Sequence, residues 1–345
     1  TVDNITLNFS AIGKWRSTTS IEQEKSLDLS SSAKYAYNFG KENYYLLFKW
    51  LKNLPVFGEF FSESRFYYTP DKLSANISLN ENDKLSKQRI GTETPTYSLK
   101  MQRDFTLNYK FTKNFQVNYT KNISSNLDEY KDHKYEIIKN LAPGLIKNVK
   151  EKFTTTYSPD YLGWLDPKIT YNPVYSWDLA TQNDSLSLSN INVTAPFKTT
   201  MNITPKEIVE LFYTPESKSG SSSQSRSRSR GRKSSSSIKS TKLYEFKNPV
   251  MKYFLGKIHS LFSIATKLKL SYDHSETHKL NNIMASDSPD YFYRLGFSST
   301  PSNLSYNNDG GTYSFTHKRD DKFTASTSLN ITSKLQISKI EYKNN

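Results

Sequence analysis

Residues 105–122, FTLNYKFTKNFQVNYTKN, alternate between apolar and polar side chains on both sides of a short polar break. The apolar residues of the two arms are Phe105, Leu107, Tyr109, Phe111, Phe115, Val117 and Tyr119. Because successive side chains of a β-strand point to opposite faces, this alternation predicts two strands with one apolar and one polar face. The break at Lys113-Asn114 predicts the turn of a β-hairpin.

The same alternation recurs along the chain. Further runs occupy residues 5–9, 27–39, 73–79, 197–203, 268–272, 291–297, 323–331 and 335–337. The polar parity of these runs consists almost entirely of Asn, Ser, Thr and Lys. The sequence therefore predicts an all-β protein built from long antiparallel strands, with a few short helices in the connections.

Composition narrows the class of β protein. Mean hydropathy is −0.71, yet aromatic residues make up 14% of the chain, which does not fit a disordered protein. Several runs reach the roughly 9–11 residues that a tilted membrane-crossing strand needs, and aromatic residues stand at many run ends, as in an interfacial girdle. The sequence is compatible with a transmembrane β-barrel and with a soluble β-sandwich. The two differ in whether the alternate apolar side chains point outward or into the protein.

In a barrel the apolar parity contacts lipid and the polar parity faces a wet lumen. We accordingly predict that the lipid-facing residues include Leu79, Phe105, Leu107, Val117, Leu329 and Ile331. The predicted lumen-facing residues include Asn76, Ser78, Asn108, Asn118, Thr324 and Ser328. A soluble sandwich would instead bury the apolar parity between two sheets.

Two insertions interrupt the strand pattern. Residues 44–64 form an irregular or short-helix insertion. Residues 204–262 are predicted to form a helix, a basic loop and a second helix, with Pro205 at the first position of the first helix and Asn248 capping the second. We expect both helices at the same end of the strands, because one follows a strand and the other precedes the next.

The basic character of the chain is local. Formal net charge is +14, and residues 217–240 contain seven basic residues and no acidic one. The basic residues at the centre of this segment are Arg226, Arg228, Arg230, Arg232 and Lys233. Such an Arg-Ser run lacks apolar side chains to bury, so we predict a disordered loop in 217–240 and no nucleic-acid partner. We place this loop on the periplasmic side, with an external position as the alternative.

No catalytic, cofactor or metal site is predicted, and we expect no enzymatic activity. The chain has no cysteine and only five histidines. His274 and His278 are four residues apart, a spacing that suits a metal on a helix. Here they follow an alternating run in polar sequence without a third ligand, so we expect a solvated loop.

Several stretches together resemble one family. They are RFYYTPDKLSANISLN (65–80), QRDFTLNYKFTKNFQVNYTKNISSNL (102–127), FTTTYSPDYLGWLDPKITYNPVYSW (153–177) and PDYFYRLGFSSTPSN (289–303). In this order they are similar to the SprA family (also called Sov), the outer-membrane translocon of the type IX secretion system in Bacteroidetes-type Gram-negative bacteria. The resemblance covers most of the chain.

The resemblance implies a segment of a very large single-chain transmembrane β-barrel. Its implied function is a protein-conducting pore that passes folded cargo to the cell surface and supports gliding motility. The implied partners are outer-membrane lipid, secreted cargo proteins, other secretion-system subunits and the remainder of the chain, since 345 residues do not supply the whole barrel and the sequence begins inside an alternating run. The alternative is a secreted or cell-surface β-rich adhesin or scaffold without a pore.

Overall fold

The computed structural model of the protein describes most of the chain. The described residues are 4–40, 43–47, 49–53, 64–159, 164–182, 187–210, 212–213, 248–262, 264–284, 288–302, 304, 314–330 and 336–344. The Arg-Ser segment and Ile331 lie outside these residues, as does most of the insertion after Asn53. Predictions for those parts of the chain stay predictions.

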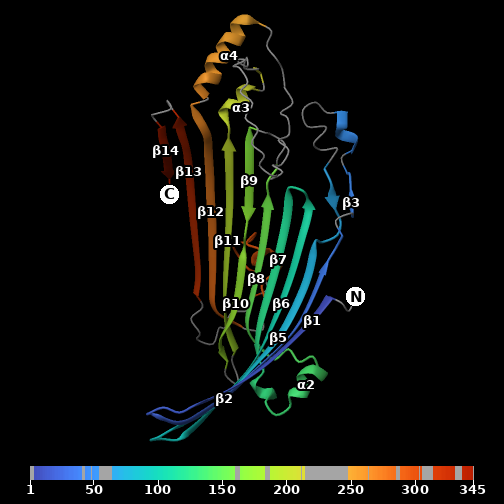
Figure 1. Cartoon of the computed structure of the whole chain (residues 1–345), viewed down its shortest axis with the longest axis vertical. Helices are drawn as coiled ribbons and strands as arrows, with labels where there is room; N and C mark the ends of the chain where they lie inside the picture. Colours follow the sequence, from blue (N-terminus) through green and yellow to red (C-terminus); the bar gives the residue numbers. More distant parts are fainter. Residues whose placement is uncertain are drawn as a thin grey trace, which may run out of the picture.

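One large antiparallel sheet dominates the structure (Figure 1). Its strands are β1 (Ile5–Arg16), β2 (Ile21–Asn38), β5 (Lys72–Gln88), β6 (Glu93–Thr112), β7 (Phe115–Asn126), β8 (Leu145–Tyr157), β9 (Leu165–Tyr171), β10 (Val174–Gln182), β11 (Ser187–Ile203), β12 (Ala265–Met284), β13 (Ser314–Asn330) and β14 (Gln336–Asn344). The sheet order follows the chain order, except that β9 and β10 share one position between β8 and β11 and that β2 pairs with β5. The prediction of long antiparallel strands with next-neighbour pairing is confirmed.

The hairpin predicted for residues 105–122 is formed by β6 and β7. Leu107 pairs with Tyr119 and Tyr109 pairs with Val117, which keeps the apolar parities of the two arms on the same face. The turn falls at residues 113–114, where Thr112 pairs with Phe115. β6 begins before the quoted stretch, at Glu93, and β7 ends after it, at Asn126.

A single proline divides one strand of the sheet. β9 and β10 both lie between β8 and β11, and they are separated by Asn172 and Pro173. Proline has no backbone N–H, so it interrupts the ladder of hydrogen bonds. The carbonyl of Pro173 still accepts a hydrogen bond from the Phe153 amide at 3.0 Å, which holds the interrupted strand in register.

Short elements occupy the two ends of the sheet (Figure 1). At one end, β3 (Tyr44–Tyr45) and β4 (Phe66–Tyr67) form a two-stranded sheet. The 3-10 helix η2 (Lys49–Asn53) and the helices α3 (Pro205–Glu210) and α4 (Pro249–Phe262) lie at the same end. The 3-10 helix η3 (Asp128–Tyr130) and α2 (Lys134–Lys139) lie at the other end. Among the described residues, none of the helices has the length and apolar character that a membrane crossing requires.

Helices α3 and α4 flank the basic segment, and they lie at the same end of the sheet. Asn248 caps α4 through its side-chain oxygen, which accepts a hydrogen bond from the Val250 amide at 2.9 Å. His259 of α4 contacts Glu210 of α3 at 3.0 Å between Nε2 and Oε1. This contact joins the helices before and after the insertion.

The strand predicted for residues 291–297 is wrong. Tyr291–Arg294 form the short helix α5, with Asp290 in extended conformation before it. Gly296 follows with a φ of 75°, a conformation that glycine adopts without the penalty of a Cβ atom. The alternation of aromatic residues here serves a helical turn and its exit, not a strand.

Candidate functional site

The register assigns every strand residue to one of two faces of the sheet. Residues that pair directly share a face, and the pairs Asn76–Asp104, Ser78–Gln102 and Asn108–Asn118 belong to the same face. Thr324 pairs with Ser271 on this face, and strand alternation assigns Ser328 to it. We call it the polar face; it contains all six predicted lumen-facing residues.

Side chains hydrogen-bond across neighbouring strands on the polar face. Asp104 of β6 accepts hydrogen bonds from Asn76 of β5 at 3.1 Å and from Asn122 of β7 at 2.7 Å. Asn202 donates to Asp166 at 3.1 Å in the same way between β11 and β9. The polar face is thus a lattice of amides, hydroxyls, carboxylates and lysine ammonium groups, several of which contact one another.

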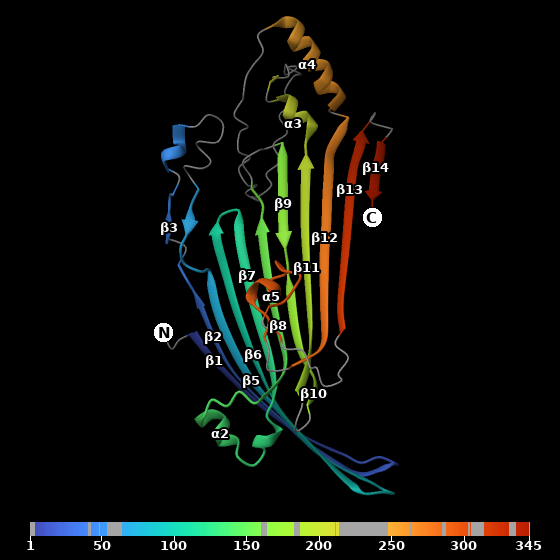
Figure 2. The same ribbon diagram turned by 180° about the vertical axis from the view of Figure 1, so that it is seen from behind.

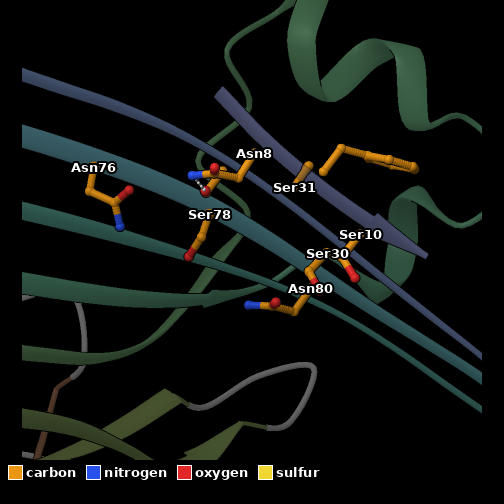
Figure 3. Close-up of a pocket in the computed structure, with 9 residues that line it drawn as sticks. Asn8, Ser10, Ser30, Ser31, Asn76, Ser78 and Asn80 are labelled. Carbon is orange, nitrogen blue, oxygen red and sulfur yellow. Dashed lines mark hydrogen bonds between the residues drawn. The ribbon is translucent and has the colours of Figure 1, made fainter. Parts of the chain in front are cut away.

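This lattice is hollowed where the first strands twist. A cavity of about 360 Å³ is lined by β1, β2 and β5. Figure 3 shows Asn76, Ser78 and Asn80 of β5 lying beside Asn8 and Ser10 of β1, with Ser30 of β2 between the strands. Its lining contains amide and hydroxyl groups but no acid, base or thiol, so it supplies no catalytic group.

The opposite face, which we call the apolar face, contains a band of apolar side chains that are exposed or half-buried. The residues of this apolar band are Leu73, Phe105, Leu107, Tyr109, Val117, Tyr119, Phe153, Phe197, Met201, Leu270, Tyr272 and Phe323. Phe105 is 41% exposed, while Leu107 and Val117 are half-buried. The only other sheet in the described part of the chain is the small β3–β4 pair, which meets the band at one margin, where the Tyr109 hydroxyl donates to the Tyr67 carbonyl at 2.9 Å.

Two connecting segments cover other parts of the apolar face, while Leu7, Phe9 and Ile77 remain exposed. Residues 127–143, which we call the α2 segment, place Leu127 and Ile137 against Leu99 and Met101. Leu79 is half-buried beside this cluster, at the margin of the exposed surface. The side chain of Leu329 and the whole of Ile331 lie outside the described structure, so lipid contact by these residues stays a prediction.

The second cover consists of residues 288–302, which we call the strap; Figure 2 shows its helix α5 lying over the middle of the sheet. Tyr293 is fully buried in a cluster with Tyr175, Trp177 and Ile283. The hydroxyl of Tyr171 donates to the carbonyl of Leu295 at 2.6 Å. A Cβ atom added at Gly296 would lie 2.4 Å from the Cβ of Ala195, so the strap approaches the sheet more closely than a larger residue permits.

A buried ion cluster fixes the strap to the sheet. Glu151 of β8 contacts Lys121 of β7 at 3.0 Å and also contacts Arg294 of the strap. The Glu151 side chain is 7% exposed, and the Arg294 guanidinium lies 5.2 Å from the ring centre of Tyr175. Lys121 and Glu151 pair directly and point to the apolar face, next to the Tyr119–Phe153 pair of the apolar band.

A second polar cluster lies on the apolar face at β12 and β13. His274, Glu276 and His278 alternate along β12, so all three point to one face. β13 places Asp321 opposite His274 and His317 opposite His278. We call these five residues the histidine cluster. The solvated loop predicted for His274 and His278 is therefore wrong: both are strand residues, and His278 is fully buried.

The ligand atoms of three members lie close together. One nitrogen of His278, one of His317 and a carboxylate oxygen of Glu276 are all within 4.8 Å of one another. The imidazole rings of His278 and His317 stack with centres 4.5 Å apart. Neither ring nitrogen of His278 has a hydrogen-bond partner, although Nε2 is 3.5 Å from Oε2 of Glu276.

Three side chains surround the carboxylate of Asp321. Its oxygens lie 2.7 Å from the Tyr272 hydroxyl, from Nδ1 of His274 and from Nε of Arg319. The cluster lies below the apolar band, on the side of the sheet where the strap docks.

The sequence contained the signal for this cluster in part. His274, Glu276 and His278 occupy alternate positions, as donors on one face of a strand do. The four-residue spacing of His274 and His278 suits a metal only on a helix, so it did not indicate this cluster. The third member, His317, is distant in the sequence, and only the β12–β13 register identifies it. No local pattern around His317 marks it as a partner.

The fold defines a mostly β protein, with one open antiparallel sheet whose two faces differ in polarity. Among the described residues, no strand pairs with the outer edge of β1 or of β14. Comparison of the sequence with protein-family models and with curated proteins gave no match. Function is therefore inferred from the faces of the sheet and from the resemblance of the quoted stretches.

Proposed function

We propose that this chain is a wall segment of a protein-conducting β-barrel in the bacterial outer membrane. The observation that carries the proposal is the pairing of a partly exposed apolar band on one face with a polar face on the other. In water an exposed band of this kind is unfavourable, whereas lipid covers it without further protein. The polar face would then line an aqueous lumen.

The aromatic residues at one margin of the apolar band support this proposal. Outer-membrane barrels flank their apolar belt with girdles of aromatic residues. Tyr109, Phe111 and Phe115 cluster at one margin, with ring centres 4.0 Å and 5.3 Å apart, as a girdle requires.

The polar face suits the passage of proteins more than the selection of ions. Several of its amides are hydrogen-bonded to carboxylates of the same face, so these carboxylates are less available to bind a passing surface. The carboxylate of Asp104 is engaged by Asn76 and Asn122 rather than displayed. Cargo of varied sequence could slide along such a wall without binding tightly.

Closure of the barrel requires further strands. β1 and β14 each expose one edge, and unpaired strand edges are avoided in a membrane. The similarity to the SprA family of type IX translocons supplies a reason: the wall of such a pore extends over a much longer chain. On this proposal, cargo proteins and other secretion-system subunits are the partners.

A surface scaffold without a pore is the second candidate. The covering of the lower apolar face by the strap and the α2 segment favours it, because buried clusters of this kind occur in soluble β proteins. The two candidates differ in what meets the apolar band: lipid in the barrel, and protein or water in the scaffold.

Single cysteines distinguish the two candidates, since these 345 residues contain none. We would introduce Leu107→Cys, Asn108→Cys, Val117→Cys and Asn118→Cys separately into the full-length protein and attach a nitroxide label in isolated outer membranes. A wall segment requires labels at 107 and 117 to be relaxed by oxygen and labels at 108 and 118 by a water-soluble nickel chelate. Equal access of the chelate to all four positions would refute the membrane assignment.

A photoreactive residue tests conduction. Placed at Asn108, it should crosslink to secreted proteins in actively secreting cells; placed at the neighbouring Leu107, it should crosslink to lipid. Cargo adducts at both positions, or at neither, would contradict a lumen on the polar face.

A further inference from the structure

Glu276, His278 and His317 combine three features of a metal site. Their donor atoms are two imidazole nitrogens and a carboxylate oxygen, which zinc accepts together. His278 is fully buried, yet neither ring nitrogen has a hydrogen-bond partner. A buried polar group without a partner is costly, so its occurrence at a converging donor set points to a ligand.

We propose that Glu276, His278 and His317 bind a divalent transition-metal ion of the Zn²⁺ type, which joins β12 to β13. This inference does not depend on the membrane location of the sheet. The two-residue spacing of Glu276 and His278 puts both donors on one face of β12, and the strand register adds His317 from β13.

The distances fit with a small movement. Tetrahedral zinc with ligand bonds of 2.0–2.2 Å separates its ligand atoms by about 3.4 Å. Nε2 of His278 and Oε2 of Glu276 are already 3.5 Å apart. The remaining separations, up to 4.8 Å, need to close by about 1.4 Å, and His317 is exposed and has space to rotate.

A second layer of contacts orients the glutamate. Oε1 of Glu276 lies 3.5 Å from Nε2 of His274, whose Nδ1 contacts Oδ1 of Asp321 at 2.7 Å. Asp321 is itself held by the Nε of Arg319 at 2.7 Å. Chains of carboxylate and histidine around a ligand fix its direction, and their loss typically weakens metal binding by about 10- to 100-fold.

The site lies where a crosslink has a structural effect. The His278 ring is 6.1 Å from Tyr293, the buried anchor of the strap. An ion bound there would fix the β12–β13 register next to the docked strap. His317 leaves one side of the site open to solvent, which provides a route for the ion and a position for a water ligand.

Metal titration of the purified full chain tests the proposal. After chelator treatment, the protein is titrated by calorimetry with Zn²⁺ alone, and Co²⁺ is used to record the visible absorption of a tetrahedral site. We expect one equivalent of tight binding. His317→Gln should weaken binding at least tenfold while leaving the sheet intact, because this side chain is exposed.

Two further variants make the outcome decisive. Asp321→Asn should weaken binding about 10-fold or more without removing a ligand, and His133→Gln, which changes a distant exposed histidine, should leave affinity unchanged. Unchanged affinity in His317→Gln overturns the proposal, as does an equal loss in His133→Gln. Absence of saturable binding in the folded native chain overturns it as well.

Discussion

Replacing Glu151 by glutamine should release the strap from the sheet. The carboxylate of Glu151 contacts both Lys121 and Arg294, and it is largely buried. Glutamine keeps the size of the side chain but removes its charge. Two cations then remain at the site. Lys121 is already partly exposed, whereas the largely buried Arg294 returns to water only when the strap undocks.

The magnitude follows from the geometry. At 3.0 Å, the Lys121–Glu151 attraction is about 5 kcal/mol for an effective dielectric constant of 20. Removing one partner of a buried pair typically costs about 3–5 kcal/mol. Since docking of the strap brings Arg294 into the site, we expect the free energy of strap opening to fall by about 3 kcal/mol, or roughly two orders of magnitude in the opening equilibrium.

Hydrogen exchange measures this opening directly. The amides of Gly296 and Phe297 donate to carbonyls within the strap at 2.9 Å and 2.8 Å, so their exchange reports its ordered state. Glu24→Gln is the matched control, because Glu24 contacts Lys84 at the same 3.0 Å but in a more exposed pair. Such pairs contribute about 1 kcal/mol or less, and strap exchange should not change.

Two results would refute this account of the strap. One is exchange at Gly296 and Phe297 within threefold of the native rate in Glu151→Gln. The other is strict additivity in the Glu151→Gln/Arg294→Gln double variant, because removing both charges of a coupled pair should cost less than the sum of the single changes.

Three other perturbations follow from the packing. Gly296→Ala should lower the free energy of strap docking by about 2–4 kcal/mol, because Gly296 has a positive φ and an added Cβ would lie 2.4 Å from the Cβ of Ala195. Proteolysis of the strap should therefore increase. Gly40→Ala is the control, since Gly40 has open space around it and its replacement should leave strap proteolysis unchanged. Ile137→Ala should destabilise the α2 segment by about 2–4 kcal/mol, because Ile137 is 7% exposed, while its neighbour Ile138, at 75%, should tolerate alanine within about 0.5 kcal/mol in denaturant unfolding. Deletion of residues 219–237 should leave sheet assembly, measured by circular dichroism, unchanged, since the run has no apolar side chain to bury; loss of the β signal would show a structural role.

Strand identity and register were predictable where the alternation was long. In the 105–122 hairpin, local β preference, the turn residues and the parity of both arms all agree, and the structure has that pairing. The helices at Pro205 and Pro249 were predictable for a similar reason: proline at the first position and a capping residue mark the start of a helix.

Three features were not predictable from local pattern. The apolar spacing of Tyr291–Phe297 fits a strand, but the conformation of Gly296 and the burial of Tyr293 against β12 decide for a helix. Pro173 divides one strand into β9 and β10, and this division is possible because β8 and β11 pair with both parts. The histidine cluster requires a partner from another strand, so only the register assembles it.

The connection between β11 and β12 makes this sheet unusually tolerant of insertions at one point. Ile203 and Leu268 pair directly, so the chain leaves the sheet and re-enters it at adjacent positions, with residues 204–267 between them. The entropic cost of closing a loop rises only with the logarithm of its length, and doubling this loop would cost about 0.6 kcal/mol. A foreign domain could therefore be carried between Ser217 and Ser240 at little expense to the sheet, which makes this point a natural attachment site for a reporter or a displayed protein.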